Sequence, residues 1–327
     1  MRKIRVGILG TGSIVRRIMS DFPLGENYEL VAFASRTLHN AQEAKARYGA
    51  KYAFGSAEAL AACPEVDLVY IATPHNLHKP HTLLMLRAGK HVLCEKPFAL
   101  NDREAEEMIA LAREKRLFLM EAMWSRFMPA MADIKRLTDE GALGEIRLVT
   151  ANFGYSMAFN PESRIYNRSL AGGALMDVGV YALNLASFWI GSDVMQSFAQ
   201  CVKAPSGVDS RIAVQLSYEN GALAQVNAAV DTLTESRAMV YGSKGFVEIP
   251  DFWHATRYEL RYPGKVPDLK VFPDENEGHH HEFVHAADCI LRGLTESPVM
   301  PLNETVKILK TMTESRRACG IVYPEEE

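Results

Sequence analysis

The chain has 327 residues, a formal net charge of −4, 48% hydrophobic residues and 23% charged residues. This length predicts about two domains, and the composition excludes a disordered or low-complexity chain. Lysine and arginine form no long block, so nucleic acid is not expected as a partner. No run approaches 18 apolar residues and the N-terminal apolar stretch is too short for a secretion signal, so we expect neither a membrane span nor export.

The five cysteines are odd in number, scattered and never in a CxxC pair. This usage is typical of reduced thiols in a cytoplasmic protein. We therefore expect no disulfide, no metal cluster and a cytoplasmic location.

Over the first 120 residues, short apolar runs alternate with stretches of helical spacing. The predicted strands are Ile4–Leu9, Glu29–Ala34, Val66–Thr73, His91–Cys94 and Leu117–Met120, and the predicted helices are Leu38–Tyr48, Leu77–Ala88 and Asp102–Lys115. The runs are continuously apolar, as expected for strands covered on both faces. An α/β fold with a doubly wound parallel sheet is predicted.

After about residue 123 the pattern changes to strands separated by turn signals such as Glu219-Asn220-Gly221. Such hairpins predict a large, mostly antiparallel open sheet. The remaining predicted elements are the strands Ile146–Tyr155, Arg211–Tyr218, Ala222–Val230, Arg237–Tyr241 and Phe246–Ile249, and helices at Pro129–Glu140, Ala174–Trp189, His281–Leu291 and Glu304–Arg317. We expect domains at residues 1–123 and 124–327, with the last helix as a candidate to pack back on the first domain.

Gly10-Thr11-Gly12-Ser13-Ile14 follows the first predicted strand and opens a predicted helix. The first glycine allows a sharp turn, and the second lets the backbone approach a pyrophosphate at the helix N-terminus. Val15 replaces the third glycine of this fingerprint, so an ordinary strand-to-helix turn is the alternative.

The second strand ends at Ala34 and is followed by Ser35 and Arg36, without the acid that usually binds the ribose of NAD. A small polar residue before arginine suits the extra phosphate of NADP. NADP(H) is therefore favoured over NAD(H), and a solvated surface role for Arg36 is the alternative.

Two further groups of residues suggest chemistry. Lys96 follows a strand at the edge where ligands of such sheets bind, although a Lys-Pro pair is commonly just a strand-ending turn. Asp177 and Tyr181 are four residues apart and would share a face of one helix, which alone also fits an amphipathic helix with a buried tyrosine.

Taken together, these motifs resemble the Gfo/Idh/MocA oxidoreductases, the family of glucose-fructose oxidoreductase and inositol dehydrogenase. The motifs are Gly10-Thr11-Gly12, Ala72-Thr73-Pro74 with His78, Glu95-Lys96-Pro97, and Gly172-Gly173 followed by Met176-Asp177-Val178-Gly179. The segment from Glu121 to Phe127 and the tyrosine at position 181 resemble the branch of dihydrodiol and NADP-dependent sugar dehydrogenases; many other members carry histidine at that position.

The resemblance implies a Rossmann domain followed by an α/β domain whose open sheet commonly forms a homodimer or homotetramer interface. It also implies hydride transfer between a nicotinamide and a sugar, polyol or dihydrodiol. Lys96 then polarises the reacting oxygen, Tyr181 is the general acid or base, and Asp177 orients the substrate. A phenol with an ordinary pKa near 10 needs a nearby cation such as Lys96 to exchange protons near neutrality. The active site is expected to draw on both domains.

The resemblance also gives two sets of binding residues. The cofactor set is Gly10, Thr11, Gly12, Ser13, Ile14, Ser35, Arg36, Thr73, Pro74, His78, Glu95, Lys96, Trp124 and Arg126. The substrate set is Lys96, Trp124, Phe153, Tyr155, Arg164, Asp177 and Tyr181. For Trp124 a plain core role is the alternative, since large aromatic side chains are usually buried.

His281-Glu282-Phe283-Val284-His285 spells HExxH, the zinc-peptidase signature, but no third ligand follows at a recognised spacing. A zinc hydrolase is one alternative function, and a non-catalytic NADP(H) sensor is another. Lys96, Asp177 and Tyr181 together argue against the sensor, because binding alone needs no proton-transfer residues.

Overall fold

The computed structural model describes residues 2–191, 193–273 and 276–326. The chain forms two compact units. We call Met1–Ala99, Arg103–Phe127 and Glu275–Val306 unit 1, and Leu100–Asp102, Met128–Asp274 and Lys307–Glu327 unit 2. The domain ranges 1–123 and 124–327 stay a prediction, whereas the compact units interleave along the chain.

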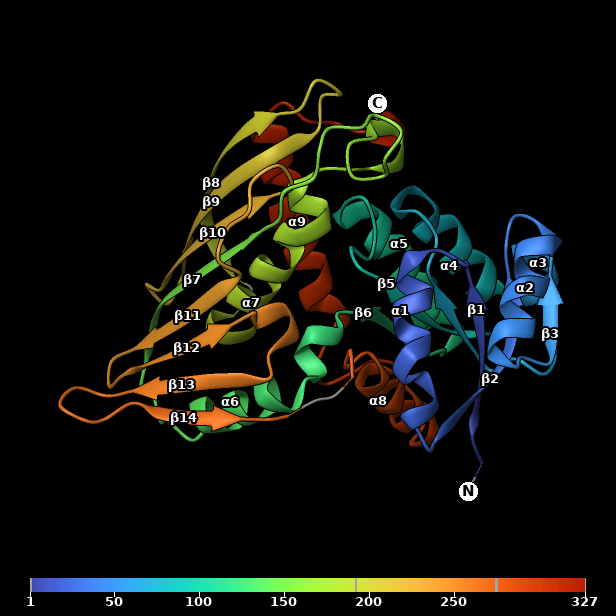
Figure 1. Cartoon of the computed structure of the whole chain (residues 1–327), viewed down its shortest axis with the longest axis horizontal. Helices are drawn as coiled ribbons and strands as arrows, with labels where there is room; N and C mark the ends of the chain where they lie inside the picture. The colour runs from blue at the N-terminus through green and yellow to red at the C-terminus, as the bar shows by residue number, and fades with distance from the viewer. Residues whose placement is uncertain (1, 192, 274–275, 327) are drawn as a thin grey trace. The chain divides into compact units, whose positions relative to one another are not determined.

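Unit 1 is built on a six-stranded sheet with the order β3-β2-β1-β4-β5-β6 (Figure 1). All neighbouring strands run parallel. The strands are β1 Ile4–Leu9, β2 Tyr28–Ala34, β3 Tyr52–Phe54, β4 Leu68–Ile71, β5 His91–Glu95 and β6 Leu119–Ala122. All five strands predicted in this region overlap observed strands, and β3 was missed because three half-buried residues carry too little periodicity. The doubly wound α/β class is confirmed.

Helices connect these parallel strands, as crossover connections require. The helices of unit 1 are α1 Ser13–Asp21, α2 Leu38–Tyr48, α3 Ala57–Ala61, α4 His78–Arg87, α5 Asp102–Lys115 and α8 His280–Leu291, with short 3-10 turns at Phe22–Leu24, His75–Leu77 and Trp124–Phe127. The helix α8 comes late in the chain but packs in unit 1, where Phe283 meets Phe22 with ring centroids 5.1 Å apart. The carboxyl ends of β1, β2, β4, β5 and β6 carry the segments that hold the predicted cofactor residues.

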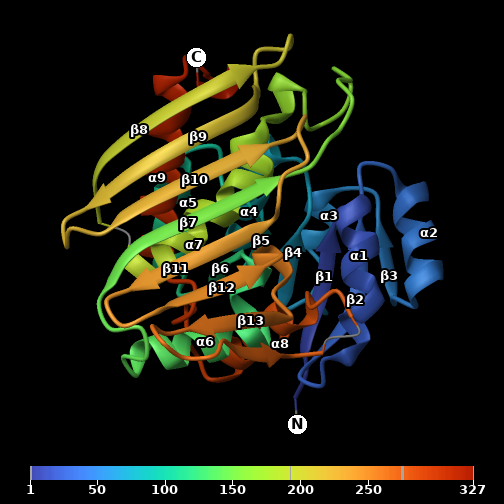
Figure 2. The same cartoon turned by 60° about the vertical axis from the view of Figure 1, so that its left-hand side comes forward.

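Unit 2 is built on an eight-stranded sheet with the order β14-β13-β12-β11-β7-β10-β9-β8 (Figure 2). Only the β7–β10 pair is parallel, and the other pairs are antiparallel. The strands are β7 Ile146–Gly154, β8 Val194–Lys203, β9 Asp209–Tyr218, β10 Leu223–Ala229, β11 Arg237–Gly242, β12 Phe246–Pro250, β13 Arg257–Arg261 and β14 Asp268–Val271. The mostly antiparallel sheet is confirmed, whereas β8, β13 and β14 were not predicted.

The two faces of this sheet differ. Along β9 the residues alternate between buried and exposed from Arg211 to Leu216, and the buried ones face the helix α7 (Val180–Ile190) side of the unit. In the described part of unit 2, no helix lies over the opposite face, which Figure 2 presents to the viewer. The other helical segments of unit 2 are α6 Pro129–Asp139, α9 Leu302–Ala318 from Lys307 onward, a π-helical turn Leu175–Gly179, and 3-10 turns Arg168–Leu170, Phe252–His254 and Pro324–Glu326.

Among the described residues, the segment Arg168–Ile190 is long and apolar enough to cross a membrane, with a mean hydropathy of 1.3 over its best window. The sequence expectation overlooked this segment because it counted uninterrupted apolar runs. Since 89% of that window is buried in the structure, the segment has the character of a core helix of unit 2.

Candidate active site

The turn after β1 has the backbone of a nucleotide-binding loop. Gly10 has a φ of 125°, and a Cβ placed there would lie 2.5 Å from the Ala72 carbonyl oxygen, so only glycine fits. Gly12 caps α1 with no side-chain hydrogen bond to the first-turn amides, and no acidic residue lies in that turn. The backbone N–H groups in the first turn of α1, starting at Ser13 and Ile14, are therefore available to bind an anion such as a pyrophosphate.

The loop after β2 lies beside this turn. The Thr11 hydroxyl donates to the Ser35 hydroxyl over 3.5 Å, which joins the two loops at the carboxyl edge of the sheet. Arg36 is exposed, and no carboxylate follows the end of β2. This edge offers hydroxyl and guanidinium donors and therefore fits a phosphorylated ribose.

Lys96 follows β5 and is half-buried. The carboxylate of Glu95 directs the local backbone: its Oε2 accepts from the Lys96 N–H over 3.1 Å, and its Oε1 accepts from the Tyr70 hydroxyl. Glu95 is itself 5% exposed. A buried carboxylate thus anchors the backbone that carries the lysine.

His78 braces the same turn from α4. One ring nitrogen lies 2.9 Å from the Pro97 carbonyl oxygen and the other lies 2.9 Å from the Thr73 carbonyl oxygen, while Pro74 caps the 3-10 turn His75–Leu77 that precedes α4. Complete burial lowers the pKa of His78 to about 4, so the ring is neutral at physiological pH. Its contact with a cofactor stays a prediction, and the observed contacts are to backbone.

Glu121 supports the turn from β6. One carboxylate oxygen accepts from the Phe98 N–H over 3.2 Å, and the other accepts from the Thr305 hydroxyl over 3.1 Å. Burial raises the pKa of Glu121 to about 7. Sequence reasoning placed this residue only within a motif and did not find its supporting role.

Trp124 and Arg126 are both buried in unit 1. The Trp124 ring stacks on His279 with centroids 4.3 Å apart and an interplanar angle of 25°. Arg126 is 2.5 Å from Glu304 and donates to the Val299 carbonyl over 3.0 Å. These contacts give both side chains a packing role, and their predicted binding roles stay predictions.

Asp177 is the centre of a polar cluster in unit 2. Its Oδ2 accepts from the Tyr155 hydroxyl over 2.6 Å, and its Oδ1 is 2.9 Å from the Arg164 guanidinium. Burial, together with the charge of Asp177, raises the pKa of Tyr155, which is therefore a neutral donor. Three predicted substrate residues are thus found together.

An aromatic wall continues from this cluster. Phe153 lies two residues before Tyr155 at the end of β7, so both side chains point to the same face of the sheet. Its ring centroid is 5.7 Å from that of Tyr181 and 5.5 Å from that of Trp253, which stacks on it at 12°. Trp253 was not predicted, since it comes from a 3-10 turn about 100 residues further along the chain.

The helix that carries Asp177 begins with a π-helical turn, Leu175–Gly179, where an α-helix was predicted. Gly173 enters the turn with a φ of 122°, and the buried Asp209 side chain accepts from the Leu175 N–H over 2.7 Å. Burial raises the pKa of Asp209 to about 7. Asp177 therefore sits in the π turn and Tyr181 in the α-helix, so the four-residue spacing does not stack them as in a regular α-helix.

The C-terminal segment holds the other side of this glycine turn. The Tyr323 hydroxyl donates to the Gly172 carbonyl over 2.7 Å, and Arg168 donates to the Val322 carbonyl over 2.9 Å. The fully buried Arg316 forms an ion pair of 2.9 Å with Glu326. No sequence signal links these residues to the turn.

The HExxH segment opens α8 and has no zinc-site geometry. Glu282 is completely buried, and both its carboxylate oxygens lack hydrogen-bond partners. His285 Nε2 is 2.7 Å from the Ser297 hydroxyl and 3.4 Å from the Cys289 sulfur. Within the described ranges, no three His, Cys, Asp or Glu side chains are grouped to hold a metal. The zinc-hydrolase reading is not favoured.

Two family models match the chain, one in its N-terminal part and one in its C-terminal part. Residues 4–123 match the oxidoreductase family with an NAD-binding Rossmann fold, and residues 131–248 match the GFO/IDH/MocA C-terminal domain. The chain belongs to the Gfo/Idh/MocA oxidoreductase family. The resemblance predicted from the motifs is confirmed.

Two relatives in this family are trans-1,2-dihydrobenzene-1,2-diol dehydrogenases. The mouse enzyme is 35% identical and the human enzyme 34% identical, each with 99% of both chains covered. Among solved structures, aldose-aldose oxidoreductase from Caulobacter crescentus, complexed with glycerol, has a TM-score of 0.88 and 31% identity over 98% of each chain. The 3-ketoreductase KijD10 from Actinomadura kijaniata, with NADP and TDP-benzene, has a TM-score of 0.86 and 27% identity, covering 97% of this chain and 98% of that one.

This Gfo/Idh/MocA chain is therefore an NAD(P)-dependent oxidoreductase. Its own residues fit the cofactor: the Gly10 turn admits no side chain, and the Gly12 cap leaves the first amides of α1 for a pyrophosphate. The predicted site residues divide between the units. Gly10 to Arg126 belong to unit 1, and Phe153 to Tyr181 belong to unit 2.

Proposed function

We propose that this oxidoreductase prefers NADP(H) and acts on a secondary alcohol, hemiacetal or carbonyl carbon of a sugar, polyol or trans-dihydrodiol. The observation that carries the proposal is the cluster of Asp177, Tyr155 and Arg164 beside the aromatic wall of Phe153, Tyr181 and Trp253. A carboxylate with two donors suits vicinal hydroxyls, and aromatic rings suit the apolar face of a sugar or cyclohexadiene ring. The names of the relatives support the same substrate class.

Each catalytic group has a separate role in this proposal. Lys96 donates to the reacting oxygen and stabilises the negative charge that develops on it. Tyr181 gives or takes the hydroxyl proton, and Asp177 holds a neighbouring substrate hydroxyl with Tyr155 and Arg164. When bound, the nicotinamide supplies or accepts the hydride.

The preference for NADP(H) rests on the loop after β2. Ser35 and Arg36 offer a hydroxyl and an exposed guanidinium, and no carboxylate there would repel a 2′-phosphate. Thr73, Pro74, His78, Glu95, Trp124 and Arg126 stay proposed cofactor neighbours, and Trp124 a proposed substrate neighbour.

We further infer a cytoplasmic homodimer or homotetramer assembled through the open face of the eight-stranded sheet. Phe198, Val202 and Leu223 are exposed by 60%, 49% and 51% on β8 and β10. Large apolar side chains exposed on an uncovered sheet face suit a subunit interface. The described cysteines are unpaired thiols, which suits a reducing compartment.

The test is steady-state turnover with NADP+ and NAD+ on aldoses, inositols and trans-dihydrodiols, followed at the nicotinamide absorbance. Lys96→Ala and Tyr181→Phe are expected to lower kcat by about 10²–10⁴-fold, because proton transfer and polarisation contribute on that scale. Binding of NADPH, measured by fluorescence titration, should stay within a few-fold of wild type in both variants.

Lys115→Ala, on the exposed end of α5, is the matched control and should leave kcat unchanged. Full turnover in Lys96→Ala or Tyr181→Phe would remove the catalytic assignment. Tight NADPH binding without turnover on any of these substrate classes would favour the redox-sensor alternative. Activity lost to a chelator would favour the zinc hydrolase.

A further inference from the structure

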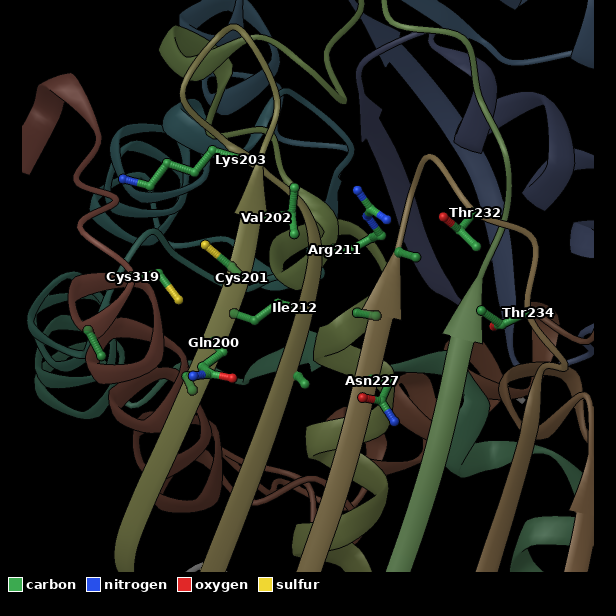
Figure 3. Close-up of a pocket in the computed structure, with 15 residues that line it drawn as sticks. Gln200, Cys201, Val202, Lys203, Arg211, Ile212, Asn227, Thr232, Thr234 and Cys319 are labelled. Carbon is green, nitrogen blue, oxygen red and sulfur yellow. The ribbon is translucent and has the colours of Figure 1, made fainter.

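Two cysteines from distant parts of the sequence lie side by side in unit 2. Cys201 is near the end of β8, and Cys319 follows the last residue of α9. Both line one cavity of about 670 Å³, and Figure 3 draws their sulfur atoms near each other. Cys201 also acts on the pKa of Cys319, as a near neighbour does. The pair is therefore close enough to react as a unit.

The backbone around the pair is held independently of the thiols. Lys203, two residues beyond Cys201, donates from Nζ to the Gly320 carbonyl over 2.8 Å. Gly320 directly follows Cys319. This hydrogen bond links the end of β8 to the chain that leaves α9, next to both cysteines.

The pair also lies away from the open face of the sheet. Cys201 pairs across the strands with Ile212, whose side chain is 3% exposed on the covered face, whereas its neighbour Val202 pairs with the exposed Arg211.

The other three cysteines, Cys63, Cys94 and Cys289, are buried, whereas Cys201 and Cys319 are partly exposed. Reagents in solution can therefore reach only this pair while the protein stays folded. Because of this difference in burial, a soluble thiol reagent should react at Cys201 and Cys319 before it reacts at the other cysteines.

We propose that Cys201 and Cys319 form a dithiol modification site that a peroxide converts into an intramolecular disulfide. One thiolate attacks a peroxide oxygen, the O–O bond breaks, and a sulfenic acid and water are formed. The second thiolate then attacks the sulfenic sulfur and releases a second water as the S–S bond forms. The two cysteines lose two electrons and two protons in total, the peroxide is reduced to two waters, and a small thiol reverses the reaction by exchange.

The surroundings set the rate of this reaction. Burial and the contact with Cys201 raise the pKa of Cys319 to about 12, the carboxylate of Asp209 acts in the same direction, and Lys203 opposes it. The thiolate of Cys319 is thus scarce at neutral pH. Disulfide formation is expected to be slow at pH 7 and faster at pH 9.

The test uses the full chain, purified reduced and treated with hydrogen peroxide. The expected product is a monomeric chain on a non-reducing gel that has lost two hydrogen masses and yields a peptide linking Cys201 to Cys319 after digestion. The linkage should disappear with dithiothreitol. Because the disulfide closes a loop of about 120 residues, the oxidised protein should melt several degrees higher than the reduced one.

Phenylarsine oxide, which bridges neighbouring thiols, provides an independent readout on untreated protein. Wild type should bind one equivalent and then resist alkylation at both cysteines, whereas Cys201→Ser and Cys319→Ser should bind none. Cys63→Ser is the matched control and should behave as wild type. A linkage between two chains, or oxidation that stops on one cysteine without a Cys201–Cys319 peptide, would overturn the proposal even if a serine variant failed to fold.

Discussion

The turns that carry Lys96 in unit 1 and Asp177 in unit 2 are held in different ways. The Lys96 turn is braced by Tyr70, His78 and Glu121 through hydrogen bonds that span 25, 19 and 23 residues of sequence. The Asp177 turn is braced by Asp209 and Tyr323 through bonds that span 34 and 151 residues. The first turn is held by nearby elements of unit 1, β4, α4 and β6, whereas the second is held by β9 and the chain's last segment.

The comparison predicts that unit 2 is the more sensitive to a remote substitution. Arg316→Ala should lower the free energy of unfolding by about 3–5 kcal/mol, because it leaves the Glu326 carboxylate buried without its cation. Urea denaturation at pH 7 measures this effect. Arg317→Ala, one residue along α9 and exposed, is the control and should change stability by less than about 0.5 kcal/mol. Equal effects in the two variants would show that the C-terminal segment does not hold the turn.

In unit 1 the sensitive feature is a buried carboxyl. Burial, with the nearby charges of Glu95 and Asp21, raises the pKa of Glu282 well above its usual value. The folded state keeps this proton while the unfolded state releases it. The free energy of unfolding should therefore fall as the pH rises above the ordinary pKa of a glutamate side chain. The free energy of unfolding of Glu282→Gln, relative to that of wild type, should therefore increase by up to about 1.4 kcal/mol per pH unit between pH 5 and pH 7.

Urea denaturation at several pH values measures this slope. Glu106→Gln, exposed on α5, is the control and should run parallel to wild type. A constant difference between Glu282→Gln and wild type across the range would mean that Glu282 is ionised in the folded protein.

The polar cluster of unit 2 should respond more mildly. Tyr155→Phe removes one hydrogen bond to Asp177 but leaves the ion pair with Arg164, so a loss of about 1.5–3 kcal/mol is expected for a bond to a charged group. Tyr241→Phe on β11 is the control, and thermal unfolding measures both. An unchanged melting temperature for Tyr155→Phe would indicate that Arg164 alone supports the carboxylate.

The smallest effect is expected at the exposed edge of unit 1. Arg36→Ala should weaken NADPH binding about tenfold, or about 1.4 kcal/mol, and leave NADH binding nearly unchanged. Lys45→Ala on the exposed face of α2 is the control. Fluorescence titration with both cofactors checks the difference, and equal losses for the two cofactors would remove the NADP(H) preference.

Local patterns were sufficient for much of unit 1. Continuous apolar runs predicted its longer strands. The glycine motif predicted the Gly10 turn, where only glycine fits the positive φ next to the Ala72 carbonyl. The same reasoning missed β3, which has three residues, and β8, whose mixed exposure hides its period of two. Short elements and edge strands carry too weak a hydrophobic pattern to be recognised alone.

Motifs and periodicity within a few dozen residues were enough to identify the family, the parallel sheet and the residue types of the chemistry. Three features became visible only in the folded chain: Asp209 and Tyr323 hold the Asp177 turn, Trp253 extends the aromatic wall, and Cys201 and Cys319 line one cavity. Those contacts join segments far apart in the chain, and long-range packing leaves no local signal in the residues that it brings together.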